Sequence, residues 1–261
     1  AASGWGLVPQ NVYTGLKDGE TVHDHDAMDK ALKAAVDSIL TKPSGKIDLY
    51  WMKDIDEILD EHIGAAPVDF VYEGETYTPE TFRDYLGIDP YSYINITSFT
   101  HHPFGKKFIL EIPDNFSRGK FFNVPIDEMQ RVVEGALSAG YTVAWDADVS
   151  EKGFSFSHGV ALLPAKGEEE KLWKEEIVEE VVTQESRQIG FENQTTTDDH
   201  LMHITGLATD QSGNKYFIIK NSWGQNNPYG GHQYISMAYF RAKTIAVLVN
   251  NEAVVRAFQG K

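Results

Sequence analysis

The stretch from Asp198 to Gly224 constrains the fold of this chain more than any other part of it. An apolar, β-favouring run over Leu201–Ala208 is followed by the turn-forming segment Thr209–Asn214 and by a second apolar run over Tyr216–Ile219. Two such runs around a short polar turn are the pattern of a β-hairpin. We therefore predict that both runs are neighbouring antiparallel strands.

The pairing register of this hairpin decides which side chains meet. If Ala208 faces Lys215, Asn221 lies opposite Met202, and His200 and Asn221 share one end of the hairpin. Diagonal neighbours on adjacent strands are roughly 7–8 Å apart, which is within reach of an imidazole and an amide. A histidine held by an amide oxygen is half of a Cys-His-Asn site, in which the imidazole activates a thiol. The hairpin thus predicts a catalytic pair of His200 and Asn221.

Two short motifs in this stretch carry a resemblance to a known family. Asp199-His200-Leu201-Met202 and Lys220-Asn221-Ser222-Trp223-Gly224 resemble the histidine and asparagine motifs of papain-like cysteine peptidases. Further matches, to the bleomycin hydrolase and aminopeptidase C branch, are Gly6-Leu7-Val8-Pro9, Asn123–Asp127 and Asp148–Phe154. The Asn-Ser-Trp-Gly sequence is the specific part of the resemblance, and the isolated His-Leu-Met is weak without it.

The resemblance implies a role for each of five residues. His200 would take the proton of a cysteine thiol and deliver it to the leaving amine, and Asn221 would orient the His200 ring. Trp223 would shield the hydrogen bond between them from water, and Ser222 and Asp148 would support the cleft, with no catalytic role for Asp148. A thiolate beside an imidazolium can have a pKa of about 3–4, so the partner thiol decides the chemistry. Peptide substrates are implied, with no cofactor and no metal.

The sequence departs from this family in one essential respect, because its 261 residues contain no cysteine. In papain-like enzymes the nucleophile lies near the mature N-terminus, on a helix far upstream of the histidine. We expect Ala1 to lie downstream of that helix, so that the glutamine of the oxyanion hole is missing with it. The Cys-bearing N-terminal segment is therefore an expected partner, and this chain alone cannot perform the family's chemistry.

The expected fold is α+β and papain-like, without the helix that bears the cysteine. Residues 1–90 are expected to form a mainly helical part, because apolar residues recur at helical spacing over Asp26–Leu40 and Leu49–Ile63. Residues 91–261 are expected to form a β-rich subdomain that carries the catalytic histidine and asparagine.

Shorter patterns place further elements in these two parts. Phe70–Tyr77 is the pattern of a small hairpin, and Thr78-Pro79 is that of a helix N-terminus. A helix is predicted over Pro125–Ala139 and a strand over Tyr141–Trp145. The polar C-terminal segment Asn250–Lys261 is expected to be disordered.

Composition narrows the choice of partners. The formal net charge of −16 argues against nucleic acid and anionic membranes, since both attract basic surfaces. No apolar run approaches the roughly 20 residues that span a bilayer, and the N-terminus lacks the pattern of a secretion signal. The sequence does not decide whether the protein is a homo-oligomer or in which compartment it lies, although typical members of the bleomycin hydrolase branch are cytoplasmic.

The cluster His23-Asp24-His25-Asp26 has the ligand types of a zinc, manganese or nickel site. A helix cap at Asp24 or Asp26 is the favoured interpretation, because alternating residues in a loop have no fixed ligand face. The adjacent His101 and His102 are assigned to a hydrogen-bonded loop.

Two more sets of residues near the predicted pair have competing interpretations. Asp146 and Asp148 could form an acid-base pair, but the exit of a strand into a loop is favoured, because Asp is a good turn former. His203 lies three residues beyond His200, so in a strand its side chain points to the opposite face, away from the cleft.

Three functions compete on these observations. The favoured one is a thiol peptidase, by resemblance an aminopeptidase of the bleomycin hydrolase type, whose cysteine lies on a segment encoded upstream. The alternatives are a catalytically inactive peptidase-like binding protein and a metal-dependent hydrolase that uses the His23–Asp26 cluster. A chain without catalysis would have no need for both His200 and Asn221, which favours the peptidase.

The first prediction concerns the isolated chain. If the Cys-bearing helix is the central element of the fold, the chain without it exposes a large apolar groove and should copurify with the missing segment or aggregate. Size-exclusion chromatography with light scattering checks this expectation. A monodisperse species with the mass of these 261 residues and no bound polypeptide would contradict it.

Overall fold

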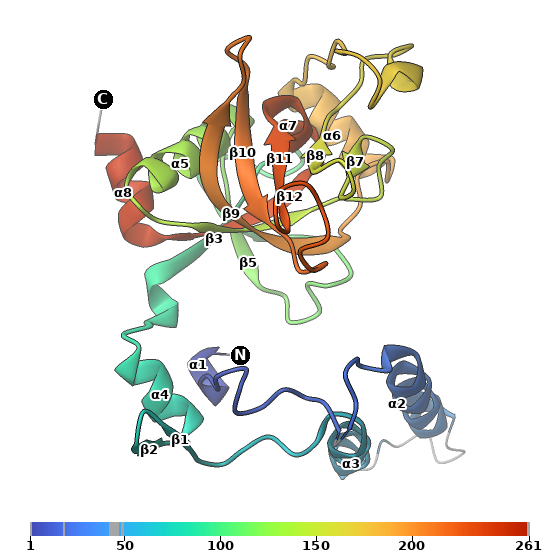
Figure 1. The fold of residues 1–261 in the computed structure, drawn as a ribbon, viewed down its shortest axis with the longest axis vertical. Coiled ribbons are helices and arrows are strands. Elements are labelled where there is room, and N and C mark those ends of the chain that lie inside the picture. Colours follow the sequence, from blue (N-terminus) through green and yellow to red (C-terminus); the bar gives the residue numbers. More distant parts are fainter. Residues whose placement is uncertain (1, 18, 42–46, 48–49, 260–261) are drawn as a thin grey trace. The chain divides into compact units, whose positions relative to one another are not determined.

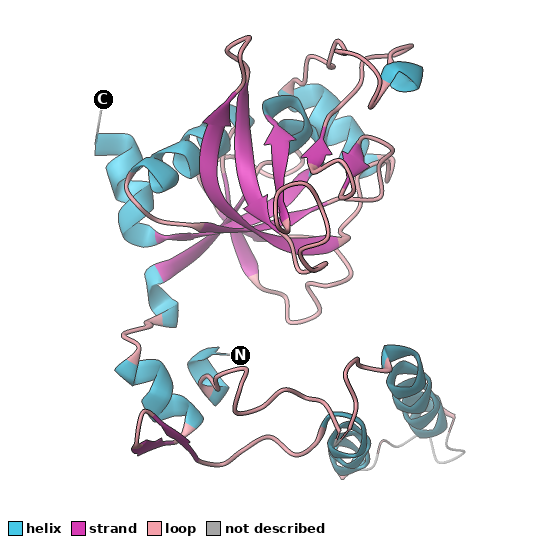
Figure 2. Cartoon of the chain, in the orientation of Figure 1, coloured by secondary structure: helices cyan, strands magenta, loops and turns pink. Residues whose placement is uncertain are grey.

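The computed structural model describes residues 2–17, 19–41, 47 and 50–259. The chain divides into two units, Ala1–Pro90 and Tyr91–Lys261 (Figure 1). Short helices and loops make up most of the first unit, and a ten-stranded sheet with helices dominates the second (Figure 2). In the described part of the chain, no helix combines the length and the apolar character needed to cross a membrane. The α+β class predicted from the sequence is confirmed.

Two helices of the first unit begin where the sequence provides a capping side chain. Its elements are α1 (Ala2–Trp5), α2 (His25–Leu40), α3 (Trp51–Ile63), β1 (Phe70–Tyr72), β2 (Glu75–Tyr77) and α4 (Pro79–Tyr85). Asp24 Oδ1 accepts a hydrogen bond from the backbone N–H of Ala27 at 3.0 Å and caps α2. Thr78 caps α4 in a reciprocal capping box with Thr81. The structure therefore agrees with the interpretation of the His23–Asp26 cluster as a helix cap.

A cluster of aromatic rings connects α4 to the β1–β2 hairpin. The Phe82 ring meets Phe70, Tyr72 and Tyr77 edge-on, with centroid distances of 5.3, 4.9 and 5.6 Å. Gly6 lies against the start of α4, where a Cβ would come within 2.1 Å of the Pro79 carbonyl carbon, and its φ is +78°. Only glycine fits this contact without strain.

The second unit is built on a mostly antiparallel sheet with the strand order β4-β5-β3-β12-β6-β9-β10-β11-β8-β7. Its strands are β3 (Tyr93–Thr97), β4 (Lys107–Ile109), β5 (Lys120–Asn123), β6 (Val143–Ala147), β7 (Phe154–Ser155), β8 (Val160–Ala161), β9 (His200–Thr209), β10 (Lys215–Lys220), β11 (His232–Ser236) and β12 (Thr244–Asn250). The pairs β3–β5 and β8–β11 are parallel. The hairpin of β9 and β10 lies in the middle of this order, between β6 and β11.

Four α-helices pack around this sheet, and they are α5 (Ile126–Ser138), α6 (Gln184–Glu192), α7 (Met237–Lys243) and α8 (Asn251–Gln259). Helices α5 and α8 lie side by side, and α6 contacts α7 (Figure 1). Met129, Val132 and Val133 of α5 are fully buried against strand residues such as Trp145 and Ile204. This core holds β6 and β9 in place, and β9 starts with the predicted catalytic histidine.

The predicted hairpin register differs from the observed one near the turn and agrees with it at the other end. Tyr216, and not Lys215, faces Ala208. A β-bulge between Ile218 and Ile219 then shifts the pairing by one residue, so that Lys220 faces His203 as the predicted register requires. The bulge inserts one extra residue into β9, which is a local irregularity that propensity does not reveal.

Two other expectations for this unit are wrong. The C-terminal segment forms the helix α8, and Ala253 and Val254 of this helix pack into the core. Strand β6 runs two residues further than predicted, to Ala147, so that Asp146 lies within the strand and only Asp148 lies at its exit.

Substitution of Thr244 tests the polar bond at the centre of this core. Trp145 Nε1 donates a hydrogen bond to Thr244 Oγ1 at 2.8 Å, and both residues are fully buried. We expect Thr244→Val to lower the free energy of unfolding by about 1–3 kcal/mol, because the indole N–H loses its acceptor in the same volume. Urea denaturation measures the change. The control is Thr209→Val at the exposed end of β9, where a change of less than about 0.5 kcal/mol is expected; equal effects of both substitutions would contradict the assignment.

Candidate active site

The β9–β10 hairpin brings His200 and Asn221 together. His200 is the first residue of β9, and Asn221 directly follows β10. His200 Nε2 lies 2.9 Å from Asn221 Oδ1. The amide oxygen can only accept, so the His200 ring carries its proton on Nε2 in this arrangement. Its Nδ1 is left without a hydrogen-bond partner among the described residues, and a neutral imidazole with that nitrogen unprotonated can accept a proton there.

Both ends of the Asn221 amide are held. The backbone N–H of Ser222 donates to Asn221 Oδ1 at 2.7 Å, and Asn221 Nδ2 donates to Gln233 Oε1 at 3.0 Å. Asn221 is buried, whereas the Ser222 side chain is exposed and contributes through its backbone alone. The backbone N–H of Asn221 also donates to the Gly231 carbonyl at 3.2 Å, which joins the end of β10 to the turn before β11.

Trp223 lies over the histidine ring. The centroids of Trp223 and His200 are 5.0 Å apart and the ring planes differ by 22°, a stacked arrangement. Phe154 and Phe156 meet Trp223 edge-on at 5.8 and 5.7 Å. Trp223 is itself 46% exposed, so one side of the indole stays open to solvent. The ring thus covers one face of the His200 imidazole, the placement that shielding of the His-Asn hydrogen bond requires.

Asp148 lies in the interior, which differs from its predicted place on the wall of the cleft. The residue is 1% exposed, and its carboxylate accepts hydrogen bonds from Ser150 Oγ at 2.8 Å and from the backbone N–H of Thr197 at 3.2 Å. Lys243 Nζ lies 3.5 Å away. Burial raises the pKa of the Asp148 carboxyl, and the Ser150 and Lys243 contacts oppose that rise. Asp148 fixes the chain before His200 from inside the sheet.

Asp146 and Asp198 form a carboxyl pair beside the strand that starts at His200. Asp146 Oδ1 and Asp198 Oδ2 are both buried and take no hydrogen bond from a donor among the described residues. Burial raises the pKa of Asp146 to about 8, and the hydrogen bond with Asp198 adds to that rise. The pKa of Asp198 is also raised, mainly by burial. The pair therefore holds a proton at neutral pH, with the pKa of Asp146 at about 8.

His101, His102 and Glu111 form the one three-ligand group among the described residues that could hold a metal ion. The nitrogen His101 Nε2 lies 3.1 Å from the Glu111 carboxylate, and His102 Nε2 lies 2.8 Å from it. Gln188 Oε1 accepts from the backbone N–H of Thr100 at 2.6 Å, which turns Gln188 Nε2 towards His101 Nδ1 at 3.0 Å.

This network opposes metal binding at His101. A nitrogen that accepts from Gln188 carries no proton, so the proton of the neutral His101 ring is on Nε2, where it blocks coordination. Burial raises the pKa of Glu111, but the hydrogen bonds from His102 and His101 outweigh burial and lower it. The cluster is a hydrogen-bonded loop, in agreement with the assignment made from the sequence.

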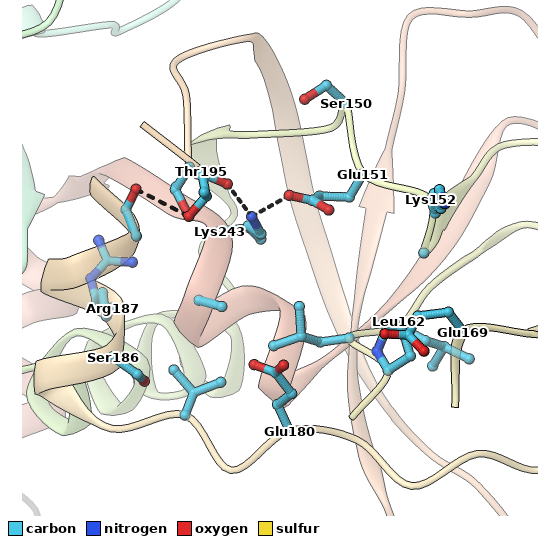
Figure 3. A pocket seen from close by; sticks show the side chains of 17 residues that line it. Ser150, Glu151, Lys152, Leu162, Glu169, Glu180, Ser186, Arg187, Thr195 and Lys243 are labelled. Atoms are coloured by element: carbon cyan, nitrogen blue, oxygen red, sulfur yellow. Dashed lines mark hydrogen bonds and ion pairs between the residues drawn. The ribbon is translucent and has the colours of Figure 1, made fainter. Parts of the chain in front are cut away.

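A cavity of about 540 Å³ lies between α6, α7 and the loop that follows β6 (Figure 3). Lys243 stands at its wall and donates to Glu151 and, at 2.5 Å, to the Thr195 carbonyl. Arg187, also at the wall, is buried and has no carboxylate partner in the described part of the chain; it donates to the backbone carbonyls of Ser98 and Arg241. Burial lowers the pKa of Arg187 to about 9. Among the described residues no histidine lines this cavity, so the pair of His200 and Asn221 lies outside it.

Sequence reasoning missed several residues around the site. Trp173 lies in the charged segment 166–180 and stacks on His158 at 4.7 Å with 6° between the rings. Its φ of +68° is unusual for a bulky residue. Gln233 was not singled out because a glutamine within a strand gives no sequence signal. The unusual Asp198-Asp199 pair before His200 is the signal that could have indicated the carboxyl pair.

Substitution of Asp146 tests the proton held by the carboxyl pair. The native state holds a proton on Asp146 up to about pH 8, whereas the ordinary pKa is 3.8, so the native state binds more protons than the unfolded state between these values. The free energy of unfolding should therefore fall as the pH rises through this window. We expect Asp146→Asn to reduce that fall, as measured by urea denaturation at pH 5 and pH 8. The control is exposed Asp56→Asn, which should keep the wild-type pH dependence; an Asp146→Asn protein with that same dependence would refute the proton held by the pair.

Comparison with known proteins places this geometry in a family. A search of curated proteins gives no match. Among solved structures, the chain is similar to PepW from Lactobacillus rhamnosis HN001, with a TM-score of 0.69 and 18% identity over 99% of this chain and 63% of PepW. The chain thus spans less than two thirds of the PepW length. A partial match is bromelain from Ananas comosus, with a TM-score of 0.28 and 16% identity over 45% of this chain and 43% of bromelain. Another is the ragweed pollen cysteine protease Amb a 11, with a TM-score of 0.30 and 18% identity over 48% of this chain and 30% of that protein.

The sequence profile of the Peptidase C1-like family matches residues 5–260. The resemblance drawn from the His200 and Asn221 motifs is confirmed at the level of the family, and the papain-like fold is confirmed by the PepW match. Because the matched region is almost the whole chain, this protein belongs to the Peptidase C1-like family.

Proposed function

We propose that this chain carries the histidine and asparagine of a cysteine peptidase of the bleomycin hydrolase type. The observation that supports this most directly is the 2.9 Å hydrogen bond from His200 Nε2 to Asn221 Oδ1, which leaves Nδ1 available as a base. The nucleophile has to come from outside these 261 residues, because they contain no cysteine. The Cys-bearing segment is therefore the first partner that the proposal requires.

In the proposed reaction His200 moves one proton in each half of the cycle. The thiol proton passes to His200 Nδ1 while the sulfur bonds to the carbonyl carbon of the peptide. The C–N bond then breaks and His200 gives its proton to the leaving amine. In the second half, a water gives a proton to His200 and attacks the thioester, and the proton returns to the sulfur as the acid leaves. Asn221 keeps Nε2 protonated, so that Nδ1 is the atom that accepts and releases the proton in each transfer.

The proposed substrates are peptides with a free N-terminus. This exopeptidase specificity rests on the resemblance of Gly6–Pro9, Asn123–Asp127 and Asp148–Phe154 to the aminopeptidase branch. The formal net charge of −16 agrees with it to the extent that an N-terminal ammonium is attracted to an acidic protein.

A binding protein without catalysis is the alternative, and labelling of the thiol separates it from the proposal. The protein isolated from the cells that make it is treated with iodoacetamide, and intact masses are measured under denaturing conditions. We expect a polypeptide with one alkylated cysteine, either bound to this chain or continuous with it. Only a species with the mass of these 261 residues, without label and without peptide hydrolysis, would reject the peptidase.

Substitution of His200 tests its role in that protein. We expect His200→Ala to lower peptide turnover by about 10²–10⁴-fold, the usual contribution of a general acid-base group. The matched control is His203→Ala, three residues further along β9 and exposed, where turnover should stay within about twofold. Turnover of an N-terminal amino-acid amide measures both. Equal turnover in the His200→Ala and His203→Ala proteins would contradict the assignment.

A further inference from the structure

Gln233 lies where it can act on the proposed catalytic pair through Asn221. It is the second residue of β11 and faces Ile219 in the register with β10, two residues before Asn221. Its side chain is fully buried, in a strand whose inward neighbour Ile235 is also fully buried. A polar amide at this apolar position needs a specific partner. Its Oε1 has one, because it accepts from Asn221 Nδ2 at 3.0 Å.

The orientation of the Asn221 amide depends on partners at both of its ends. The Ser222 backbone N–H can only donate, so the Asn221 atom that lies 2.7 Å from it must be the amide oxygen. Gln233 Oε1 can only accept, so the other atom of the Asn221 amide, which faces it, must be the nitrogen. Rotation of the amide by half a turn would place Nδ2 against the Ser222 N–H and Oδ1 against Gln233 Oε1, and both contacts would be lost.

This orientation decides which His200 nitrogen carries the proton. With Oδ1 towards the ring, His200 Nε2 donates and Nδ1 is unprotonated. With Nδ2 towards the ring, Nε2 would have to accept, and the proton of the neutral ring would sit on Nδ1. A ring in that second tautomer cannot take a thiol proton at Nδ1. The proposed reaction therefore needs the amide in the orientation that Gln233 favours.

The other end of Gln233 argues against a purely structural role. Gln233 Nε2 is buried and has no hydrogen-bond partner among the described residues. An unmet buried donor destabilises the folded state, and an apolar side chain of the same length would fill this space without that donor. Packing alone thus favours methionine or leucine at position 233. The acceptor at Oε1 is the feature that only the polar residue supplies.

We infer that Gln233 is a positioning residue that holds the Asn221 amide with its oxygen towards His200 and so keeps the proton of the neutral ring on Nε2. The catalytic consequence rests on the proposed peptidase function, but the effect on the His200 ring does not.

The test compares two substitutions of similar length in the full chain, together with any polypeptide that copurifies. Gln233→Met removes the acceptor, whereas Gln233→Glu keeps an oxygen opposite Asn221 Nδ2. Histidine is labelled with ¹⁵N, the His200 signals are assigned with His200→Ala, and long-range ¹H–¹⁵N spectra report the tautomer and the exchange of the ring N–H with water. The His203 ring in the same spectra is the internal control, and the melting temperature of each variant establishes that it is folded.

In the wild type we expect His200 in the Nε2–H tautomer with a slowly exchanging ring proton. In Gln233→Met we expect that proton to exchange about tenfold faster and the Nδ1–H tautomer to gain population, because Asn221 has lost one of its two anchors. Gln233→Glu should restore the wild-type signals, and His203 should be unchanged throughout. If Gln233→Met does not fold, Gln233→Leu takes its place.

Two results would overturn the inference. Unchanged His200 signals in a folded Gln233→Met protein would mean that the Ser222 N–H alone sets the Asn221 orientation. Equal changes in the Met and Glu proteins would mean that the volume at position 233 matters and its acceptor does not. Neither readout needs a cysteine, so failure of the peptidase proposal in the labelling experiment would leave this test intact.

Discussion

The hydrogen bond between His200 and Asn221 is the interaction on which the rest of the site depends. It forms only because β9 and β10 pair in a register that places the first residue of one strand near the residue that follows the other. The bulge in β9 is part of that geometry, because a hairpin continued without it would carry the one-residue offset seen near the turn to the His200 end. Pairing of β9 with β6 on its other side then fixes the strand within the sheet, with Ala147 opposite His200.

The segment that leads into His200 is held by acidic groups, and their partners differ. Asp148 has Lys243 and three hydroxyl or backbone donors, whereas the Asp146–Asp198 pair holds a proton. Asp199 accepts from Thr197 Oγ1 at 2.7 Å and from two backbone N–H groups. Asp148 is buried, Asp146 and Asp198 are partly buried, and Asp199 is exposed. The inner three need these partners, because a buried charge without one would destabilise the fold far more than any turn preference could offset.

The sequence predicted the elements that have a local cause and missed those that depend on distant contacts. The caps at Asp24 and Thr78 and the β9–β10 hairpin follow from short patterns, and the structure has all three. Helix α8 was missed because its 9 residues, although amphipathic, are too few to form a stable helix alone, and the packing of Ala253 and Val254 into the core stabilises them. The burial of Asp148 was missed for the same reason, since its main cation, Lys243, lies 95 positions further along the chain.

The interior around Asn221 shows why a site of this kind is not optimised for stability. Among the residues that the structure describes, the buried amide N–H of Gln233 has no partner, and an apolar side chain beside Ile219 and Ile235 would pack with no such loss. The same amide provides the acceptor that holds the nitrogen end of Asn221. The Nε2 end of Gln233 thus lowers the stability of the fold, whereas its Oε1 end fixes the orientation of the Asn221 amide. A polar residue within a strand is a weak sequence signal. Its role becomes evident only when the fold shows which groups its amide oxygen and nitrogen contact.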